Sequence, residues 1–281
     1  MSKSVADNPR KRFADIVSCE DEQIDLAEAA LLIAAEEYAG LDVPLYIEKL
    51  DRIGDLAREH AEGARTTSDM IAAINTTLFD ELGFCGNREN YYDPRNSFLN
   101  EVLDHRTGIP ITLTVVYMET ARRIGFPVLG VGLPGHFIAK HISDEGDIFI
   151  DTFNDGRLLG EAGCAEILKE MSGGRLELKP SHIAAVTNKQ ILTRMLSNLL
   201  GIYADSIDHA RSLAAIERIL LINPDSPPHV RDRGLLLAAL GKTAAALPEL
   251  KRYLTLAPEA RDSSVIREQI KSLQQTLARM N

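Results

Sequence analysis

TGIPITL, residues 107–113, is the stretch of this chain that decides its fold. From there to about position 124, apolar side chains recur at helical spacing and two arginines precede Gly125, so the sequence predicts a helix. Pro110 occupies its first position, where the missing N–H costs nothing and the fixed φ suits the beginning of a helix. A thiol ionises readily at that position, because the helix dipole and free N–H groups stabilise the thiolate. Proline has no group that could act as a nucleophile.

Two apolar segments further along predict an antiparallel hairpin. HFIAK (residues 136–140) and IFID (148–151) are separated by the turn-forming SDEG (143–146). Folding the chain about this turn brings His136 within one or two residues of Asp151, so we expect a hydrogen bond between the two side chains. A carboxylate beside a histidine orients the imidazole as a general base. The sequence therefore keeps a base and its partner without a nucleophile.

The pattern before and around the hairpin predicts an α+β domain. Helical periodicity covers residues 24–38, 44–60 and 68–82, and a loop rich in Asn, Asp, Pro and Tyr follows from 83 to 107, with one short helix near 98–103. A strand at 127–132 and a helix at 162–171 flank the hairpin. Residues 1–20, with a basic run at 10–12, look like a flexible, solvated N-terminus. Helices followed by a small antiparallel sheet are typical of the α+β class.

After about residue 187 only helical patterns remain. NPD at 223–225 recurs as APE at 257–259, so Pro224 and Pro258 lie 34 residues apart, which is the period of a tetratricopeptide repeat. Further helices are predicted at 189–204, 207–222 and 265–278. We predict domains at 21–187 and 188–281, the second an all-α tetratricopeptide-like module, with an ordinary helical bundle as the alternative. Repeat stacks offer a concave surface, so a protein or peptide partner is expected there.

Together these motifs resemble the transglutaminase-like branch of the papain-type cysteine enzymes, in which a Gly-x-Cys motif begins the helix. GIP at 108–110 matches that motif with proline in place of cysteine, and GFP at 125–127 matches the turn after the helix. NYYDPRNSFLN (90–100), GHF (135–137) and DTFN (151–154) resemble more closely the bacterial transglutaminase-like/TPR family, whose members are often labelled SirB-type regulators. A related domain occurs in some F-box proteins. The resemblance spans most of residues 20–260 and implies a degenerate triad at Pro110, His136 and Asp151.

Three functions are compatible with these residues. The first is a non-catalytic protein, without a confident catalytic residue, that acts in protein–protein interaction or regulation. The second is a cysteine-type hydrolase or acyltransferase with a relocated thiol, Cys85, working with His136 and Asp151. Cys164 and Thr112 are the other candidates for that nucleophile, but Cys164 lies in an amphipathic helix and Thr112 points to a different side of the first turn. The third is a small-molecule or peptide binder that uses the old cleft.

The loop before the decisive stretch supplies candidate binding residues. Aromatic and arginine side chains dominate binding sites. The expected binding set is therefore Tyr91, Tyr92, Asp93, Arg95 and Asn96, with His136 and Asp151. The alternative is that the loop side chains satisfy one another in turns, while His136 and Asp151 form a buried pair that fixes the hairpin.

Composition argues against other classes of function. Lys and Arg number 31 against 41 Asp and Glu, and the formal net charge of -10 argues against a nucleic-acid partner. Three widely spaced cysteines indicate neither a disulfide framework nor a zinc cluster. His136 and His141 would face opposite sides of a strand, so no metal is expected, and no phosphate-binding glycine loop indicates a cofactor. We expect a cytoplasmic protein without a membrane partner, and the sequence indicates no oligomeric state.

Overall fold

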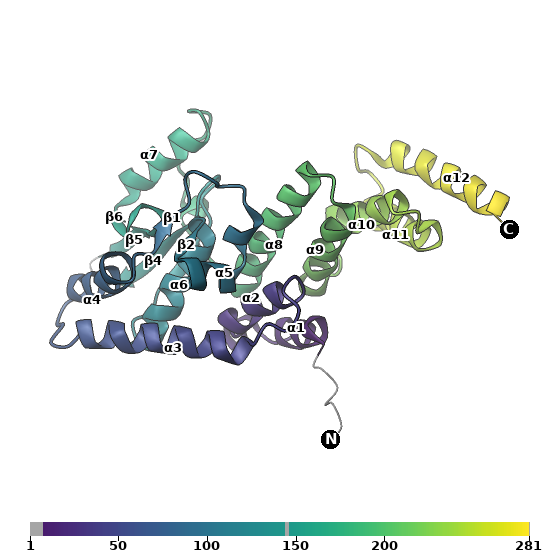
Figure 1. Cartoon of the computed structure of the whole chain (residues 1–281). Coiled ribbons are helices and arrows are strands. Elements are labelled where there is room, and N and C mark those ends of the chain that lie inside the picture. Colours follow the sequence, from purple (N-terminus) through teal and green to yellow (C-terminus); the bar gives the residue numbers. More distant parts are fainter. Residues whose placement is uncertain (1–7, 144–145, 281) are drawn as a thin grey trace, which may run out of the picture. The chain divides into compact units, whose positions relative to one another are not determined.

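The computed structural model describes residues 8–143 and 146–280 (Figure 1). The chain divides into two compact units between Met195 and Leu196, inside helix α8 (Asn188–Asp205). The first unit is α+β and the second is all α, in agreement with the sequence. The predicted boundary at 187/188 lies at the beginning of α8, so the last part of the first unit is the N-terminal half of that helix.

In the described part of the first unit, seven α-helices precede α8: α1 (Pro9–Val17), α2 (Leu26–Ala35), α3 (Val43–His60), α4 (Thr67–Asn75), α5 (Leu99–His105), α6 (Pro110–Arg123) and α7 (Glu161–Met171). Side-chain oxygens of Asp25, Asp42 and Thr66 accept N–H groups at the beginnings of α2, α3 and α4, which fixes where these helices start. The predicted helix at 68–82 is α4 together with a π-helical continuation, residues 76–81.

The expectation of a flexible N-terminus is wrong for residues 9–17. These residues form α1, which begins at Pro9 with the Asn8 side chain as its cap. Phe13 is fully buried, so the helix contributes to the core of the unit. The basic run is not a solvated tail either, because Arg10 pairs with Glu36 at 2.9 Å and Arg12 pairs with Glu28. The buried residues of α1 are Phe13 and Val17, and most of the others are polar, so the hydrophobic pattern gives little indication of a helix here.

Five strands form an antiparallel sheet in the order β6-β5-β4-β3-β7: β3 (Leu129–Val131), β4 (Ile138–Ser143), β5 (Gly146–Asp151), β6 (Arg157–Leu159) and β7 (Ala185–Val186). The predicted hairpin is confirmed, with Ala139 opposite Ile150, while residues 144–145 of its turn lie outside the described part of the chain. The edge strands β6 and β7 are too short to produce a detectable alternation in the sequence. Two further short strands, β1 (Cys85–Gly86) and β2 (Thr107–Gly108), pair in parallel.

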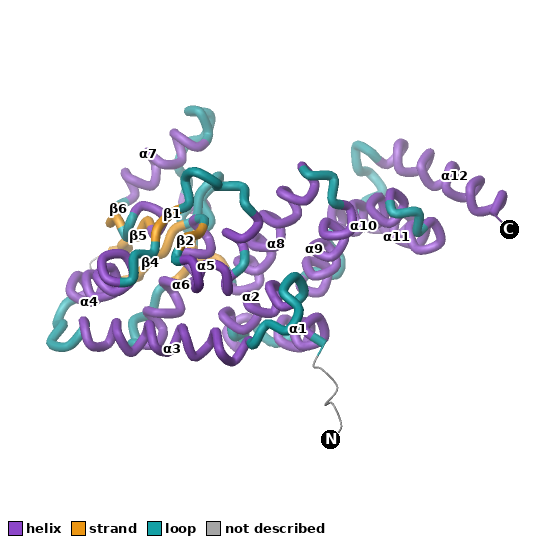
Figure 2. Tube along the Cα trace, in the orientation of Figure 1, coloured by secondary structure: helices purple, strands orange, loops and turns teal. Residues whose placement is uncertain are grey.

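Helix α6 is the centre of the first unit. It packs against α3, which lies next to it in Figure 2, and it also contacts β3 and β4. Every residue from Pro110 to Tyr117 is buried, which is why this segment reads as nearly continuous apolar sequence. The Tyr117 ring is fully buried and stacks on Phe79 with 6.4 Å between ring centroids. The N-terminal end of α6 is therefore held from several sides.

The second unit continues with α9 (His209–Ile222), α10 (Pro227–Ala239), α11 (Thr243–Leu256) and α12 (Ser263–Met280). Successive helices pack on one another around Ile216, Val230 and Leu250, as in stacked helical hairpins. Gly234 is needed at the crossing of α10 and α11, because a Cβ there would lie 2.6 Å from Leu250 Cδ2. The small-residue positions of the predicted repeat thus allow close packing of these helices.

Candidate functional site

His136 and Asp151 form a buried hydrogen-bonded pair. His136 lies two residues before β4 and Asp151 ends β5, and the His136 Nε2 donates to Asp151 Oδ1 at 2.9 Å. Their side chains are only 7% and 2% exposed. The predicted contact between the two residues is confirmed. The other ring nitrogen, Nδ1, makes no hydrogen bond to residues 8–143 or 146–280, so it is the atom with which His136 could meet a ligand.

The surroundings of Asp151 keep it ionised. Burial alone would raise the pKa of this carboxyl. The hydrogen bond and charge of His136, a hydrogen bond from Asn154 Nδ2 to Oδ2 at 2.7 Å, and one from the Phe153 N–H outweigh burial and lower the pKa below its ordinary value. Three hydrogen-bond donors, the His136 imidazole among them, therefore converge on one buried carboxylate.

Acid should weaken the fold through this carboxylate. Because the pKa of Asp151 is lower in the folded chain than in the unfolded one, its contribution to stability is complete above about pH 4 and is lost as the pH falls through the folded value. We expect the free energy of unfolding to fall between pH 5 and pH 3, and to fall less steeply in Asp151→Asn. Urea unfolding across this pH range measures both slopes. Equal slopes would contradict this account of the pair.

The N-terminal turn of α6 lies beside the end of β5. Thr114 Oγ1, one turn into the helix, lies 2.9 Å from Thr152 Oγ1, and it also donates to the Pro110 carbonyl at 2.8 Å. Thr112 Oγ1 accepts the Ile109 N–H at 3.2 Å and donates to the Asn96 carbonyl at 2.8 Å. Thr112 is thus a fully buried capping side chain, engaged in the backbone. Pro110 begins the helix, as the sequence predicts.

Aromatic rings lead from the pair to the surface. Phe153 meets His136 edge-on at 6.2 Å between ring centroids and meets Tyr91 at 6.0 Å. Tyr91 in turn contacts Tyr92, which is 76% exposed, at 5.3 Å. Arg88 lies over the Phe153 ring at 5.0 Å. Burial, and to a lesser extent Tyr92, raise the pKa of Tyr91. Of the predicted binding residues, the structure therefore brings Tyr91 and Tyr92 together with the His136–Asp151 pair.

The loop before α5 is held by hydrogen bonds among its own residues, Asp93, Arg95 and Asn96. The Asp93 carboxylate accepts the Arg95 N–H at 2.9 Å and the Arg95 guanidinium at 2.7 Å, and this hydrogen bond holds the pKa of Asp93 below its ordinary value. Asn96 is buried and donates to the carbonyls of Asn90 and Tyr91 at 2.7 and 3.1 Å. These contacts match the alternative in which the loop satisfies its own polar groups. Asn96 still matters to the site, because it fixes the backbone that carries Tyr91.

None of the thiols is engaged with His136. Cys85 is exposed on β1, and its sulfur lies 3.8 Å from Thr107 Oγ1. The adjacent Gly86 faces Phe153, since a Cβ there would lie 2.6 Å from its ring. Neighbouring strand residues point to opposite sides, so the Cys85 side chain points away from Phe153. Cys164 is packed in the core beneath the sheet, where burial raises its pKa to about 11.

Arg194 is a part of the site that the sequence did not indicate. Its guanidinium donates to the carbonyls of Leu133 and His136 at 3.0 and 2.8 Å and lies 5.3 Å from the Phe137 ring centre. It therefore holds the turn that presents His136. Burial lowers its pKa, opposed by the nearby Tyr91. The boundary predicted at 187/188 places Arg194 in the second domain, so the sequence does not indicate that it contacts the turn before β4.

His141 belongs to a different environment. Its Nδ1 lies 2.8 Å from the Pro127 carbonyl, and its ring stacks on Phe126 at 4.1 Å between centroids. Within the described ranges, no three His, Cys, Asp or Glu side chains gather as a metal site would require. No described helix is both long and apolar enough to cross a bilayer.

Comparison with known families supports this arrangement. The sequence pattern of the transglutaminase-like superfamily matches residues 45–197, which is more than half of the chain. The chain belongs to the transglutaminase-like superfamily. A tetratricopeptide repeat pattern matches residues 199–271, so the transglutaminase-like domain is followed by TPR helices. The resemblance inferred from the motifs is confirmed.

Two bacterial relatives match this chain over most of their own length. A protein of Xylella fastidiosa (strain Temecula1) named UPF0162 protein is 38% identical over 90% of this chain and 91% of its own. Protein SirB1 of Salmonella typhimurium is 26% identical over 86% of this chain and 91% of its own. F-box only protein 21 of Mus musculus is 34% identical over 56% of this chain but only 26% of its own length, so the similarity covers about a quarter of that protein. No solved structure matches the chain.

Proposed function

We propose that this chain is a non-catalytic transglutaminase-like protein that acts by binding a protein partner. The observation that carries the proposal is that Pro110 stands at the first position of α6. The next turn of this helix contacts Thr152, which directly follows Asp151 of the buried His136–Asp151 pair. A transferred acyl group needs a nucleophile with a displaceable proton, and the proline side chain has none. The pair then serves structure and binding in place of turnover.

The candidate nucleophiles of the alternative enzyme, Cys85, Cys164 and Thr112, are poorly placed for catalysis. Cys85 points away from Phe153 and its ring neighbour His136, and the raised pKa of Cys164 disfavours a thiolate in the core. The Thr112 hydroxyl accepts the Ile109 N–H and donates to the Asn96 carbonyl, so its proton is already engaged. A relocated nucleophile would require a rearrangement of β1 or of the first turn of α6.

Two features support a partner of protein or peptide nature. Stacked tetratricopeptide helices usually mediate protein–protein contacts, and residues 199–271 match that repeat. In the first unit, the row of rings from His136 through Phe153 and Tyr91 to the exposed Tyr92 favours the third candidate function, a peptide held against the old cleft. Three free thiols, two of them exposed, are consistent with a reducing cytoplasm as the place of action.

The Cys85→Ser variant tests this function against the relocated-thiol enzyme. We expect the variant to capture the same protein from a bacterial lysate as the wild type, with an affinity within about twofold, because Cys85 makes only one weak contact, with Thr107. Quantitative mass spectrometry of the captured proteins measures this. In parallel, neither protein should show thiol-dependent amidase or acyltransferase turnover.

Two outcomes would contradict the proposed function. One is an activity of the wild type that disappears in Cys85→Ser, which would establish the enzyme. The other is the absence of any reproducible, saturable partner in replicate captures with the full-length chain. Tyr92→Ala, which removes the exposed ring, is the matched variant for the first unit, and its selective loss of binding would locate the partner there.

A further inference from the structure

A cavity of about 720 Å³ lies in the first unit, and neither His136 nor Asp151 lines it. It lies between the beginning of α2, the C-terminal half of α6 and the segment that follows α6, all of them within residues 22–129, with Asn188 at its edge. Its volume is in the range of ordinary small-molecule sites. No role of the proposed function involves it.

One part of the cavity wall is apolar. Ile24, Leu26, Phe126 and Val128 are buried and line it, and Met118 adds a flexible thioether. Such a wall accommodates an aliphatic or aromatic body and removes it from water, at about 25 cal/mol per Å² of apolar surface buried. The remaining wall is polar and carries most of the specificity.

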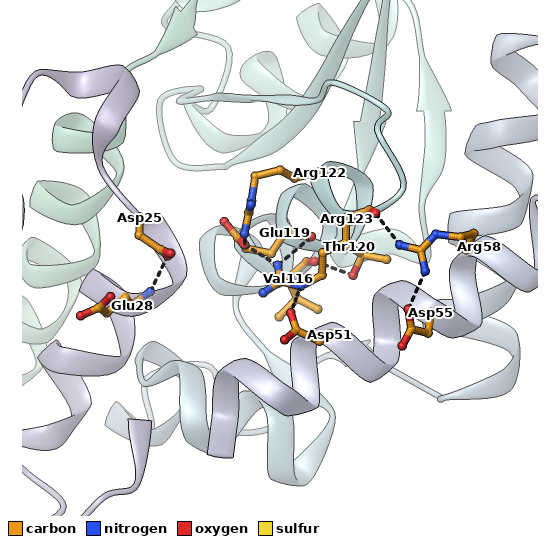
Figure 3. Close-up of polar contacts among 10 residues, drawn as sticks. All are labelled: Asp25, Glu28, Asp51, Asp55, Arg58, Val116, Glu119, Thr120, Arg122 and Arg123. Carbon is orange, nitrogen blue, oxygen red and sulfur yellow. Dashed lines mark hydrogen bonds and ion pairs between the residues drawn. The ribbon is translucent and has the colours of Figure 1, made fainter. Parts of the chain in front are cut away.

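Glu119 is the unusual polar group of this wall. It is 3% exposed, and its Oε2 accepts three hydrogen bonds, from Arg122 Nε and Nη2 at 3.2 and 2.8 Å and from Arg123 Nη1 at 2.5 Å (Figure 3). Its Oε1 accepts none from any residue that the structure describes. Oε1 is therefore the oxygen of this carboxylate that can still accept a donor brought by a ligand into the cavity.

The facing wall adds negative charge. Asp25 and Glu22 line the cavity from the beginning of α2 and the turn before it, and Asp25 uses only Oδ1, which accepts the Glu28 N–H at 2.9 Å. Asp25 lies apart from the α6 residues in Figure 3, but its negative charge still acts on the Arg122 guanidinium. The hydrogen bond that Arg122 donates to Glu119 and, more weakly, the charge of Asp25 raise the pKa of Arg122. Among the described residues that line the cavity, Arg122 is the one cationic side chain, against the carboxylates of Glu22, Asp25 and Glu119.

We propose that this cavity binds a small aliphatic amine, whose ammonium donates to Glu119 Oε1 and faces Asp25 and Glu22 while its carbon chain packs on Ile24, Leu26 and Phe126. Glu119 and Asp51 are balanced by Arg122 and Arg123, so Glu22 and Asp25 leave an excess of two negative charges, and this excess favours a cation. An ammonium has three donors and no acceptor, which matches oxygens that lack donors. A zwitterion would place a second carboxylate among these acids, with only the partly engaged Arg122 to balance it.

Titration calorimetry of the full-length chain with diaminopentane at low salt tests the proposal. We expect saturable binding with one site per chain, and binding at least about tenfold weaker in Glu119→Gln, because a hydrogen bond to a charged group is lost in part. Gln keeps an oxygen for Arg122 and Arg123, so the structural contacts of α6 persist. The double variant Glu22→Gln/Asp25→Asn should also bind about tenfold more weakly, and its fold is protected because Asn caps a helix as well as Asp does.

Asp51→Asn is the matched control. Asp51 pairs with Arg123 in the same cluster at 2.8 Å but does not line the cavity, so binding should stay within about twofold. Pentanol binding as tightly as the diamine, equal affinity in wild type and Glu119→Gln, or no saturable binding of the diamine would each overturn the proposal. Nα-acetyl-lysine amide carries the same kind of ammonium, its free ε-amine, on a peptide-like body. Weaker binding of this compound supports a free amine, and equal binding would assign the site to a lysine side chain.

Discussion

Replacing Asp151 by alanine is expected to lower the free energy of unfolding by about 3 kcal/mol, a large part of the stability of an ordinary domain. The variant removes the acceptor for His136 Nε2, for the Phe153 N–H and for Asn154 Nδ2 at once. All three donors then remain in or near a buried site without a partner, and each unsatisfied buried group costs about 1–3 kcal/mol. Urea unfolding followed by circular dichroism measures the change.

A double-mutant cycle separates the pair from the rest of this effect. We expect His136→Ala to destabilise the chain less than Asp151→Ala, and the two changes together to cost less than their sum, with a coupling of about 1 kcal/mol or more. Glu48→Ala is the surface control, because Glu48 and Arg52 form an exposed ion pair at 3.5 Å that should contribute less than about 1 kcal/mol. Additive losses would show that His136 and Asp151 stabilise the fold independently.

The hairpin and α6 could be predicted because their signals are local. Ile148 to Asp151 and the segment after His136 are apolar runs on either side of a turn sequence, and the antiparallel pairing of such runs fixes which residues meet. Pro110 marks the beginning of α6 by its own backbone chemistry. The contact between His136 and Asp151 follows from these two facts and needs no knowledge of the rest of the chain.

The missed features depend on contacts between distant segments. Arg194 reaches the His136 carbonyl from a helix that the sequence assigned to the second domain, since helical periodicity does not stop where a compact unit ends. The parallel pairing of Cys85 with Thr107 joins two-residue strands, which carry no periodicity. The direction in which Cys85 points, away from Phe153, becomes visible only when Gly86 is seen against that ring. The cavity beside Glu119 likewise needs α2 and α6 to be placed side by side.

Replacing Pro110 by cysteine should create a reactive thiol. The new sulfur would stand at the first position of α6, where free N–H groups and the helix dipole stabilise a thiolate, in a helix whose next turn contacts Thr152 beside Asp151. We expect a thiol pKa of about 7 or lower, compared with about 8.5 for an ordinary cysteine, and alkylation by iodoacetamide about tenfold faster than that of Cys85 at pH 7. The ultraviolet absorbance of the thiolate gives the pKa without depending on access of the reagent.

Two further changes to the chain, removal of the exposed cysteines and replacement of His136, isolate the properties of the thiol at position 110. For the pKa titration, Cys19 and Cys85 are changed to serine, so that the new thiol is titrated beside only the buried Cys164, whose raised pKa of about 11 keeps it separate. The alkylation rate of Cys85 is measured in the chain that keeps Cys85 and Pro110. Adding His136→Ala should return the new thiol toward ordinary reactivity, because the imidazole that would accept the thiol proton and stabilise the thiolate is then absent. A thiol at position 110 that is no faster than Cys85, or that is unaffected by the loss of His136, would mean that this proline does not occupy the place of a lost nucleophile. The His136–Asp151 pair would then be a structural feature of the hairpin alone.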